Sequence, residues 1–181
     1  MVVKIRGWEL SDATDLALAL SNKKIQNNLR DGLPYPYTEQ DGKDYISAML
    51  SANENDTFAF AITIDNKVIG SIGLHHRKPD ETLNDLKQRE IGYVLNPNYW
   101  GKGFIPEAVN CLLNYGFNEL NLDLIWCGHF DFNNNSKRVN EKCGFNYQFT
   151  KREKRKLLDN QEVNTLYYNL SKAEYLSKQT D

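Results

Sequence analysis

The chain has 181 residues, of which 40% are apolar and 25% are charged, a composition typical of a globular protein. We expect one domain over residues 1–181, because a chain of this length can bury roughly two-thirds of its unfolded surface in one core. The formal net charge of −2 argues against a general nucleic-acid binder. No apolar run has the length of a signal peptide or of a membrane span. We therefore expect a cytoplasmic protein with neither a nucleic-acid partner nor a membrane partner.

The cysteines and two neighbouring histidines give no sign of a metal site. Cys111, Cys127 and Cys143 are odd in number and form no Cys-x-x-Cys pair. Each lies in an apolar segment, so we expect core thiols in a reducing compartment and no disulfide. His75 and His76 are adjacent at the end of a predicted strand, so their side chains point to opposite faces. They cannot easily share a metal, and at most one of them faces a cleft.

The N-terminal segment predicts one strand followed by two helices. Residues 2–6 are typical of a short strand. Ser11-Asp12 is a suitable N-cap for a helix whose apolar residues fall at 16–20, and Thr38 is the expected cap of a second helix that runs through Leu50.

The loop between these helices, residues 28–37, contains two prolines, one glycine and two tyrosines. A loop of this kind can line a binding cleft, and Leu33, Tyr35 and Tyr37 are then the substrate-binding candidates. The same side chains can instead cover the edge of the core without contacting a ligand. The sequence leaves both alternatives open.

The middle of the chain predicts three strands. Thr57–Ile64 and Lys67–Leu74 are joined by Asp65-Asn66, a dipeptide suited to a tight β-hairpin, so they are predicted to be antiparallel neighbours. Residues 75–89 are polar and predict an exposed connection. Ile91–Leu95 is apolar and partly β-branched, which predicts a buried strand.

The part of the chain after this strand predicts a helix, a strand and a second helix. Apolar residues from Ala108 to Phe117 are spaced for one face of a helix that runs to about Leu120. Residues 122–130 predict a strand. Residues 133–144 predict a short capped helix that ends at Gly144, where a C-terminal glycine is expected.

A glycine-bearing loop, Trp100-Gly101-Lys102-Gly103, separates the buried strand at 91–95 from the helix that follows. Glycines let the backbone approach a ligand closely, the first turn of a helix offers unpaired N–H groups, and Lys102 adds a positive charge. This context favours a phosphate-binding loop over an ordinary tight turn. The spacing fits neither Gly-x-x-x-x-Gly-Lys-Ser/Thr nor Gly-x-Gly-x-x-Gly, which excludes a P-loop and a dinucleotide fold.

The segment Asn98–Gly103 resembles the acyl-CoA-binding motif of the GNAT (GCN5-related) N-acetyltransferases, Gln/Arg-x-x-Gly-x-Gly/Ala. Its first position is Asn98, which leaves the glycines intact but weakens a contact that the family usually makes. A second segment resembles the family's Asn-x-x-Ser/Ala followed by Glu-Lys-x-Gly-Phe. The matching residues there are Asn133, Ser136, Glu141, Lys142, Gly144 and Phe145.

The resemblance covers nearly the whole chain and implies an α/β (α+β) fold, with a mixed central sheet of about seven strands flanked by about four helices. The loop 29–37 and the strand Glu90–Leu95 look most like the ribosomal-protein N-terminal acetyltransferase (RimJ/RimL-like) branch. Many family members carry a tyrosine directly before the Glu-Lys pair, as the general acid for the CoA thiolate. This chain has Asn140 there, which moves that role, if a side chain fills it, to Ser136.

The resemblance implies an N-acetyltransferase that moves an acetyl group from acetyl-CoA to a primary amine by direct attack in a ternary complex. The acceptor is a protein N-terminal amine or a small-molecule amine. Backbone N–H groups around Val94 and Leu95 are expected to hold the pantetheine arm, and the glycine loop to hold the pyrophosphate. The residues implied in binding acetyl-CoA are Val94, Leu95, Asn98, Trp100, Gly101, Lys102, Gly103, Phe104, Asn133 and Ser136.

Direct transfer requires removal of an ammonium proton, stabilisation of an oxyanion and return of a proton to the thiolate. Glu90 is the candidate base, directly or through a water, because it enters the buried strand, where loss of hydration makes a carboxylate a better proton acceptor. The alternative is a surface carboxylate paired with Arg89. Ser136 is the candidate acid, and its alternative is a helix cap without a catalytic role.

The last part of the chain predicts a long hairpin, Phe145–Leu158 and Glu162–Leu170, about Asp159-Asn160, followed by a polar tail. Residues 151–156 form a run of five basic side chains and one acidic side chain. We expect this run to be the solvated part of the hairpin. Alternatively, it attracts an acidic partner or the 3′-phosphate end of coenzyme A.

Two other functions remain as alternatives. A non-catalytic acyl-CoA-binding sensor or partner module is supported by the departures from the family motifs at Asn98 and Asn140. A nucleic-acid binder that uses the run at 151–156 conflicts with the acidic net charge. The expected partner is the amine acceptor, with no metal, and a homodimer is a candidate assembly.

Overall fold

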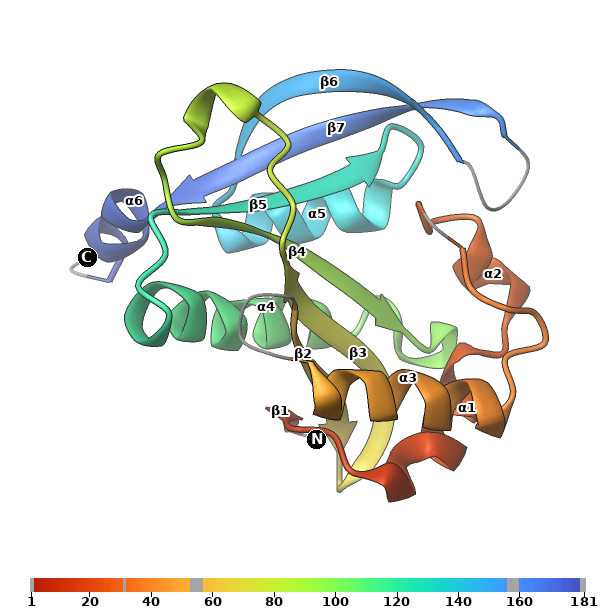
Figure 1. Ribbon diagram of the computed structural model, residues 1–181. Coiled ribbons are helices and arrows are strands. Elements are labelled where there is room, and N and C mark those ends of the chain that lie inside the picture. The colour runs from red at the N-terminus through yellow and green to blue at the C-terminus, as the bar shows by residue number, and fades with distance from the viewer. Residues whose placement is uncertain (1, 31, 53–56, 156–159, 180–181) are drawn as a thin grey trace.

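The computed structural model of the chain describes residues 2–30, 32–52, 57–155 and 160–179, and it is built around one seven-stranded sheet (Figure 1). The strand order is β1-β2-β3-β4-β5-β7-β6. Among the strand pairs of these ranges, β4 and β5 run parallel and all other neighbours run antiparallel. The strands are β1 (Val3–Arg6), β2 (Thr57–Ile64), β3 (Lys67–His75), β4 (Gln88–Leu95), β5 (Leu124–Phe130), β6 (Asn146–Lys154) and β7 (Glu162–Ser171). The predicted mixed α/β fold class is confirmed.

The described residues form six α-helical segments, which cover the two faces of the sheet (Figure 1). They are α1 (Ala13–Leu20), α2 (Lys23–Gln26), α3 (Glu39–Ser51), α4 (Phe104–Asn114), α5 (Asn134–Cys143) and α6 (Lys172–Ser177). The main apolar core lies between the sheet and the helices α4 and α5. A second cluster lies on the opposite face, beneath α1 and α3. The sheet is therefore the middle layer of three.

Several local predictions are confirmed by backbone geometry. Asp65 and Asn66 adopt φ values of 49° and 66°, as a tight hairpin turn with two left-handed residues requires. Thr38 caps α3, because its side chain accepts a hydrogen bond from the backbone N–H of Asp41. Gly144 ends α5 at a φ of 78°, a conformation that favours glycine.

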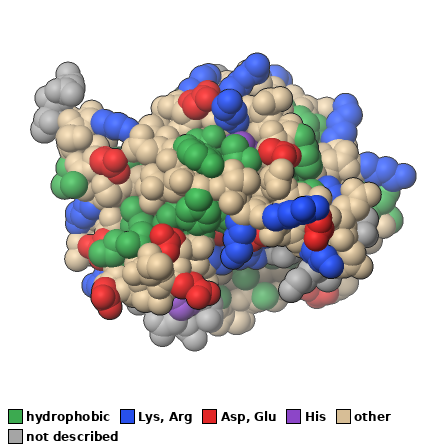
Figure 2. Space-filling model, turned by 90° about the horizontal axis from the view of Figure 1, so that it is seen from above, with side chains coloured by type: hydrophobic (Ala, Val, Ile, Leu, Met, Phe, Trp, Pro, Cys, Tyr) green, Lys and Arg blue, Asp and Glu red, His purple; other side chains and the backbone are tan. Residues whose placement is uncertain are grey.

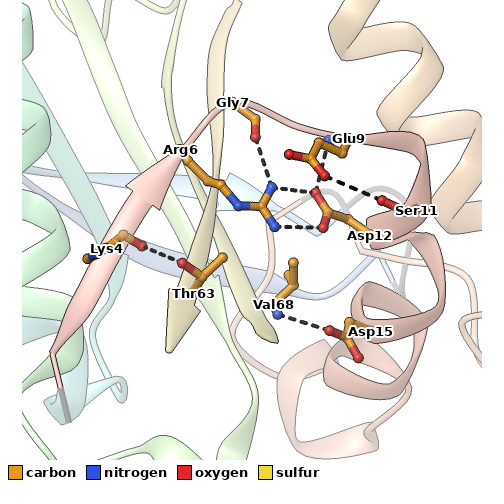
Figure 3. Close-up of polar contacts among 9 residues, drawn as sticks. All are labelled: Lys4, Arg6, Gly7, Glu9, Ser11, Asp12, Asp15, Thr63 and Val68. Atoms are coloured by element: carbon orange, nitrogen blue, oxygen red, sulfur yellow. Dashed lines mark hydrogen bonds and ion pairs between the residues drawn. The ribbon is translucent and has the colours of Figure 1, made fainter. Parts of the chain in front are cut away.

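The N-terminal strand is held to the α1 segment by a buried ion pair (Figure 3). Arg6 donates two hydrogen bonds to the carboxylate of Asp12, each 2.8 Å long. Asp12 also accepts a hydrogen bond from the backbone N–H of Glu9 at 2.9 Å, so it closes the turn that leads into α1. Farther along the helix, Asp15 accepts a hydrogen bond from the backbone of Val68 in β3. These contacts fix α1 against the sheet.

Other predictions need correction. The short helices α2 and α6 were not predicted, because four and six residues are too few to show a periodic pattern. The predicted helix to Leu120 ends at Asn114 and continues as a π-helical turn, Tyr115–Glu119. Cys111 is exposed, because it lies on the polar side of α4 with Glu107 and Asn114, whereas Cys127 and Cys143 are buried as predicted.

Part of the predicted C-terminal hairpin lies outside the described residues. This part includes Asp159 of the turn and residues 156–158. The described strands on either side pair with each other from Asn146/Asn169 to Lys154/Glu162, so the hairpin itself is confirmed. None of the helices in the described ranges combines the length and the apolar character that crossing a lipid bilayer requires.

Candidate active site

β4 and β5 separate midway along the sheet, and a cavity of about 520 Å³ opens between them. The two strands pair from Gln88/Leu124 to Ile91/Cys127. Beyond this point, residues 92–95 of β4 and residues 128–130 of β5 line the cavity. Strands that diverge leave backbone N–H and C=O groups on their facing edges without a ladder partner. An extended ligand can therefore bind along the edge of β4.

The cavity reaches both faces of the sheet, because alternate residues of β4 contribute to each face. Tyr93 and Leu95 point to the face covered by α4 and α5. Val94 packs in the cluster under α1 and α3, and Glu90 shares that face by alternation. All four residues line the cavity. A molecule bound on one face can thus meet a molecule bound on the other through the gap between β4 and β5.

The glycine-bearing loop leads from β4 into α4 at one end of the cavity. Gly101 and Gly103 adopt φ values of +75° and +85°, which favour glycine. A Cβ added to either would meet no described atom within 4 Å, so the loop backbone is open to a ligand. Because Gly103 is the N-cap of α4, no side chain satisfies the first N–H groups of this helix. The Lys102 ammonium lies 5.3 Å from the centre of the Tyr99 ring.

Two hydroxyl groups, of Ser136 and Tyr93, lie on the α4–α5 side of the cavity. The cap of α5 is Asn133, whose side chain accepts a 3.1 Å hydrogen bond from the Ser136 backbone, so Ser136 is not the helix cap. The Tyr93 hydroxyl is buried and has no hydrogen-bond partner among the described residues. Burial raises the pKa of Tyr93 well above its usual value, and the Cys127 thiol raises it further.

Asn140 does not contribute to the cavity, although it occupies the position of the family's tyrosine. The side chain is fully buried, and neither its amide nitrogen nor its oxygen has a hydrogen-bond partner in the described part of the chain. It is absent from the cavity lining. Asn140 therefore cannot contact a bound thiolate in this structure.

Glu90 forms a buried ion pair with Arg30 of the loop between α2 and α3. Arg30 Nη2 donates to Glu90 Oε1 at 2.9 Å, and Nη1 donates to Oε2 at 3.3 Å. The guanidinium of Arg89, the alternative partner, lies over the Phe58 ring at 5.6 Å. Burial acts to lower the pKa of Arg30, but the charge and hydrogen bonds of Glu90 outweigh it and raise that pKa. The alternative, in which Glu90 is a surface carboxylate, does not hold, because its side chain is 7% exposed and Arg30 binds both of its oxygens.

β5 and β7 enclose the Arg30–Glu90 pair. A Cβ added to Gly128 would lie 2.9 Å from Arg30 Nη2 and 3.1 Å from Glu90 Oε1, so glycine leaves room for the ion pair against β5. The Arg30 guanidinium lies over the Tyr167 ring at 5.5 Å, and the Tyr167 hydroxyl donates to Glu153 Oε1 at 3.0 Å. The pair is thus held from several sides.

The aromatic loop contributes two of its three predicted residues to the cavity. Leu33 and Tyr37 line it. Gln26 fixes the backbone of Leu33 by accepting from its N–H at 3.0 Å and donating to its carbonyl at 2.8 Å. Tyr35 lies outside the cavity; it is 50% exposed, and the Lys23 ammonium lies over its ring.

The structure brings most of the implied cofactor-binding residues together at the cavity. The cavity is lined by Val94, Leu95, Trp100, Gly101, Phe104, Asn133 and Ser136. The Trp100 indole donates a 2.8 Å hydrogen bond to the carbonyl of Leu95, which joins the loop to the end of β4. Asn98, Lys102 and Gly103 are outside the lining; Asn98 and Lys102 are exposed on the same loop.

Arg30, Tyr93 and His129 also line this cavity, although the sequence did not single them out. In the sequence, Arg30 is only one charged residue within an aromatic loop. Its partner Glu90 lies 60 residues away, so no local pattern identified the pair. His129 Nδ1 donates a 2.7 Å hydrogen bond to the Phe130 carbonyl, and burial lowers the pKa of this histidine. Of the adjacent histidines, His75 lines the cavity and His76 is exposed, so the prediction that at most one faces a cleft is confirmed.

Known proteins share this sequence pattern and this fold. Residues 3–146 match the family described as an acetyltransferase (GNAT) domain. The chain is 30% identical over 140 residues to an uncharacterized N-acetyltransferase, YnaD of Bacillus subtilis (strain 168). The aligned region covers 77% of this chain and 76% of that protein.

Two solved structures share the fold over nearly the whole chain. One is the ribosomal-protein-S5-alanine acetyltransferase from Vibrio fischeri, with a TM-score of 0.79 at 20% identity and coverage of 96% and 94% of the two chains. The other is the microcin C7 self-immunity acetyltransferase MccE, solved in complex with acetyl-CoA and AMP, with a TM-score of 0.76 at 20% identity and coverage of 93% and 92%. The glycine loop, the divided sheet and the family match agree, and the chain belongs to the GNAT family of acetyltransferases.

Proposed function

We propose that the chain transfers an acetyl group from acetyl-CoA to a primary amine, with both substrates bound at once. The observation that carries this proposal is the cavity between β4 and β5, which connects the glycine loop on one side with Glu90 on the other. Two substrates can enter from opposite faces and meet between the strands. A structure of a fold neighbour in complex with acetyl-CoA supports the choice of donor.

On the donor side, the backbone at Gly101–Gly103 and the start of α4 would bind the pyrophosphate, and Lys102 would add a positive charge. The unpaired edge of β4 around Val94 and Leu95 would bind the pantetheine arm as an added strand. An N–H group of the same edge, pointing at the acetyl carbonyl, would stabilise the oxyanion that forms during transfer.

Glu90 is our candidate for the base that removes the ammonium proton. Arg30 engages both of its oxygens, and each carboxylate oxygen has a further lone pair that can accept from the amine or from an intervening water. Arg30 would act as a positioning residue, because it fixes the plane of the carboxylate. The acceptor would enter along Leu33 and Tyr37 of the neighbouring loop.

The leaving thiolate needs a proton donor, and the candidates are Ser136 and Tyr93. Both line the cavity on the face where the donor would lie. A tyrosine with a raised pKa stays protonated at neutral pH, so its hydroxyl can stabilise the developing thiolate by a hydrogen bond. Tyr93 would thus fill the role that Asn140 leaves vacant.

Transfer would be direct, without an acetyl-cysteine intermediate. Cys127 lines the cavity, but burial, and to a smaller extent the charge of Glu90, raises the pKa of its thiol. Because the thiolate is the nucleophile of cysteine chemistry, this cysteine is a poor acceptor for the acetyl group.

The proposal can be tested in two steps with one preparation. Isothermal titration with acetyl-CoA should give binding, which Lys102→Gln should weaken. A thiol-release assay against a panel of amines and N-terminal peptides should then show acceptor-dependent release that Glu90→Gln lowers at unchanged fold. Mass spectrometry of the enzyme mixed with acetyl-CoA alone should find no acetyl adduct.

Each outcome of this test has a distinct meaning. Absence of acetyl-CoA binding would overturn the role of the glycine loop. Binding without release for any acceptor would favour the alternative, a non-catalytic acyl-CoA-binding module. Release that is restricted to N-terminal peptides would support the RimJ/RimL-like branch, which remains a prediction from the sequence.

A further inference from the structure

We propose that the amine acceptor carries an anionic group, a carboxylate or a phosphate, on an apolar skeleton, and that Arg77, Lys78 and Lys151 bind this group beside Glu90. The inference rests on the acetyl transfer proposed above and gives its acceptor a chemical class.

A side pocket of about 260 Å³ adjoins the main cavity and shares Arg30, Arg77 and Glu90 with it. It is lined by Arg30, Arg77, Lys78, Pro79, Glu90, Lys151, Glu153 and Tyr167. Four of these side chains are cationic and two are anionic, and both carboxylates already accept hydrogen bonds from the protein. The pocket therefore has a net positive charge and attracts an anion.

The strand register places Lys151 on the same face of the sheet as residues that line the main cavity. Lys151 lies directly opposite Thr165 of β7, so both side chains share one face of the sheet. Thr165 is fully buried and lines the main cavity. Its hydroxyl has no hydrogen-bond partner in the described ranges. Since an unpartnered buried hydroxyl is unfavourable, a ligand that hydrogen-bonds to it would be bound more tightly.

The charge run that begins at Lys151 is divided between two faces. Lys151 and Glu153 line the side pocket, whereas Arg152 and Lys154 do not. Arg152 forms an ion pair with Glu162. On the face shown in Figure 2, Lys and Arg side chains stand in groups with Asp and Glu side chains among them. The basic run is thus not one uniform patch, and one of its lysines is aimed at the candidate acceptor site.

The buried Nε of Arg30 is a further hydrogen-bond donor beside the side pocket. It makes no hydrogen bond to any described residue, and the Glu153 carboxylate lies 3.9 Å from it. A carboxylate or phosphate oxygen can accept a hydrogen bond from a guanidinium N–H that is left over in this way. The Arg30–Glu90 pair therefore offers a negative charge to the amine of the acceptor and a positive charge to its anionic group.

The charge of the main cavity argues against a polyamine acceptor. Glu90 is the sole carboxylate among the described residues that line this cavity, and Arg30 neutralises it. A polyamine would require several carboxylates to bind its several cationic groups. The acceptor side also carries apolar side chains, with Leu20, Ile25, Leu29 and Leu33 in its lining. One amine, one anionic group and an apolar body match this pattern, as in an apolar α-amino acid or its phosphonate analogue.

The acetyl transfer itself is unchanged by this choice of acceptor. A bond forms between the acceptor nitrogen and the acetyl carbon, and the carbon–sulfur bond breaks. The nitrogen loses a proton and the thiolate gains one, so the reaction is balanced without another reactant.

The test uses matched acceptors that differ only at the anionic group. L-phenylalanine is compared with L-phenylalaninamide and with phenethylamine, and the α-aminophosphonate analogue of phenylalanine distinguishes a phosphate-type site from a carboxylate site. We expect kcat/KM to be at least about 10-fold higher for the acid or the phosphonate than for the amide.

Variants then locate the anionic group. Arg77→Gln and Lys151→Gln should each raise KM for the preferred anionic acceptor by about 10-fold and leave KM for the amide unchanged. Lys154→Gln is the matched control, because it removes the same charge from the same strand outside the pocket. Calorimetry with the CoA-bound protein repeats the comparison as binding, in which no transfer can occur.

The outcomes separate this inference from the proposed function. Equal use of acid and amide, or an anionic acceptor whose binding the two variants do not weaken, overturns the anionic subsite and leaves acetyl transfer intact. Binding of the acid to the CoA-bound protein that the variants weaken, without transfer to any amine, supports the subsite and overturns the enzyme. Failure of both the acid and the phosphonate to bind overturns the subsite.

Discussion

At the scale of single residues, the candidate site is organised by an ion pair that spans 60 positions of sequence, between Arg30 and Glu90. The side chains are 23% and 7% exposed, so both charges are largely removed from water. Such a pair adds little net stability compared with an apolar replacement, but loss of one partner leaves the other charge uncompensated. The pair fixes the position of the Glu90 carboxylate beside the cavity.

Arg30→Leu should therefore destabilise the fold by about 3 kcal/mol, because Glu90 is left buried without its counter-charge. Arg30→Leu combined with Glu90→Leu should recover most of this loss, since neither charge remains. Urea unfolding of the two single variants and the double variant measures the coupling. Strictly additive effects would show that the ion pair does not join the loop to β4.

Tyr93→Phe should separate stability from activity. The hydroxyl has no partner among described residues, so its removal should leave the free energy of unfolding unchanged or raise it slightly. If the hydroxyl stabilises the leaving thiolate, kcat should fall at least about 10-fold with little change in KM for acetyl-CoA. Steady-state kinetics and thermal unfolding check both statements, with Ser136→Ala as the companion variant. An unchanged kcat in Tyr93→Phe would leave Ser136 as the donor.

At the scale of elements, the proposed donor site depends on how β4 passes into α4. The chain turns through two residues with positive φ, Gly101 and Gly103, and α4 then begins without a side-chain cap. The turn is joined to β4 by the bond from Trp100 to Leu95. Strand edge, loop and helix start thus form one continuous surface of backbone groups, which suits a ligand with an extended arm and a phosphate end.

Gly103→Ala should weaken acetyl-CoA binding through backbone strain alone. A Cβ there meets no described atom within 4 Å, but a positive φ costs a non-glycine residue about 1–2 kcal/mol. The loop would relieve the strain by moving its N–H groups. Gly103→Asn should be tolerated better, because asparagine visits this region more readily. Titration calorimetry measures the two affinities, with Gly7→Ala as an unstrained control. Equal affinities for all three variants would contradict a fixed loop conformation.

At the scale of the whole molecule, the sheet is continuous from β1 to β6, yet it is divided at its centre. β4 and β5 share a short parallel ladder and then separate around the cavity. The helices pack on both faces, so opening the sheet at this point does not expose the two larger apolar clusters. The fold is therefore able to carry a passage through its middle layer.

Global stability should decrease at acid pH through Asp12. Burial acts to raise the pKa of Asp12, but the hydrogen bonds from Arg6 and from the Glu9 backbone lower it below its usual value. A carboxylate with a lowered folded pKa adds stability above its unfolded pKa of about 3.9, and this stability is lost as the pH falls through the folded value.

Asp12→Asn should lower the free energy of unfolding at pH 7 by on the order of 1–2 kcal/mol. The variant should also show a flatter dependence of stability on pH below about 4 than the parent protein. Chemical unfolding over a pH series measures both. Parallel curves for the two proteins would show that Asp12 does not contribute to the acid transition.

Local sequence determined most of the elements and the loop of the proposed donor half of the site. Positive-φ turns at Asp65-Asn66, the cap at Thr38 and the glycine loop all depend on neighbours a few positions away, so short-range physics is sufficient to predict them. The short helices α2 and α6 were missed because four and six residues are too few to show a periodic pattern.

Only the tertiary structure could show which residues meet on the proposed acceptor side of the cavity. Whether Glu90 pairs with Arg89 or Arg30, whether Tyr35 enters the cleft, and whether Lys151 faces a pocket or solvent are questions of register and loop path. These depend on contacts between distant segments, whose energies no local pattern contains. The sequence by itself therefore determined a GNAT fold and a glycine-bearing loop, which we propose binds phosphate. Only the packing of the loop at 28–37 against β4, β5 and β7 decided which charges meet an acceptor.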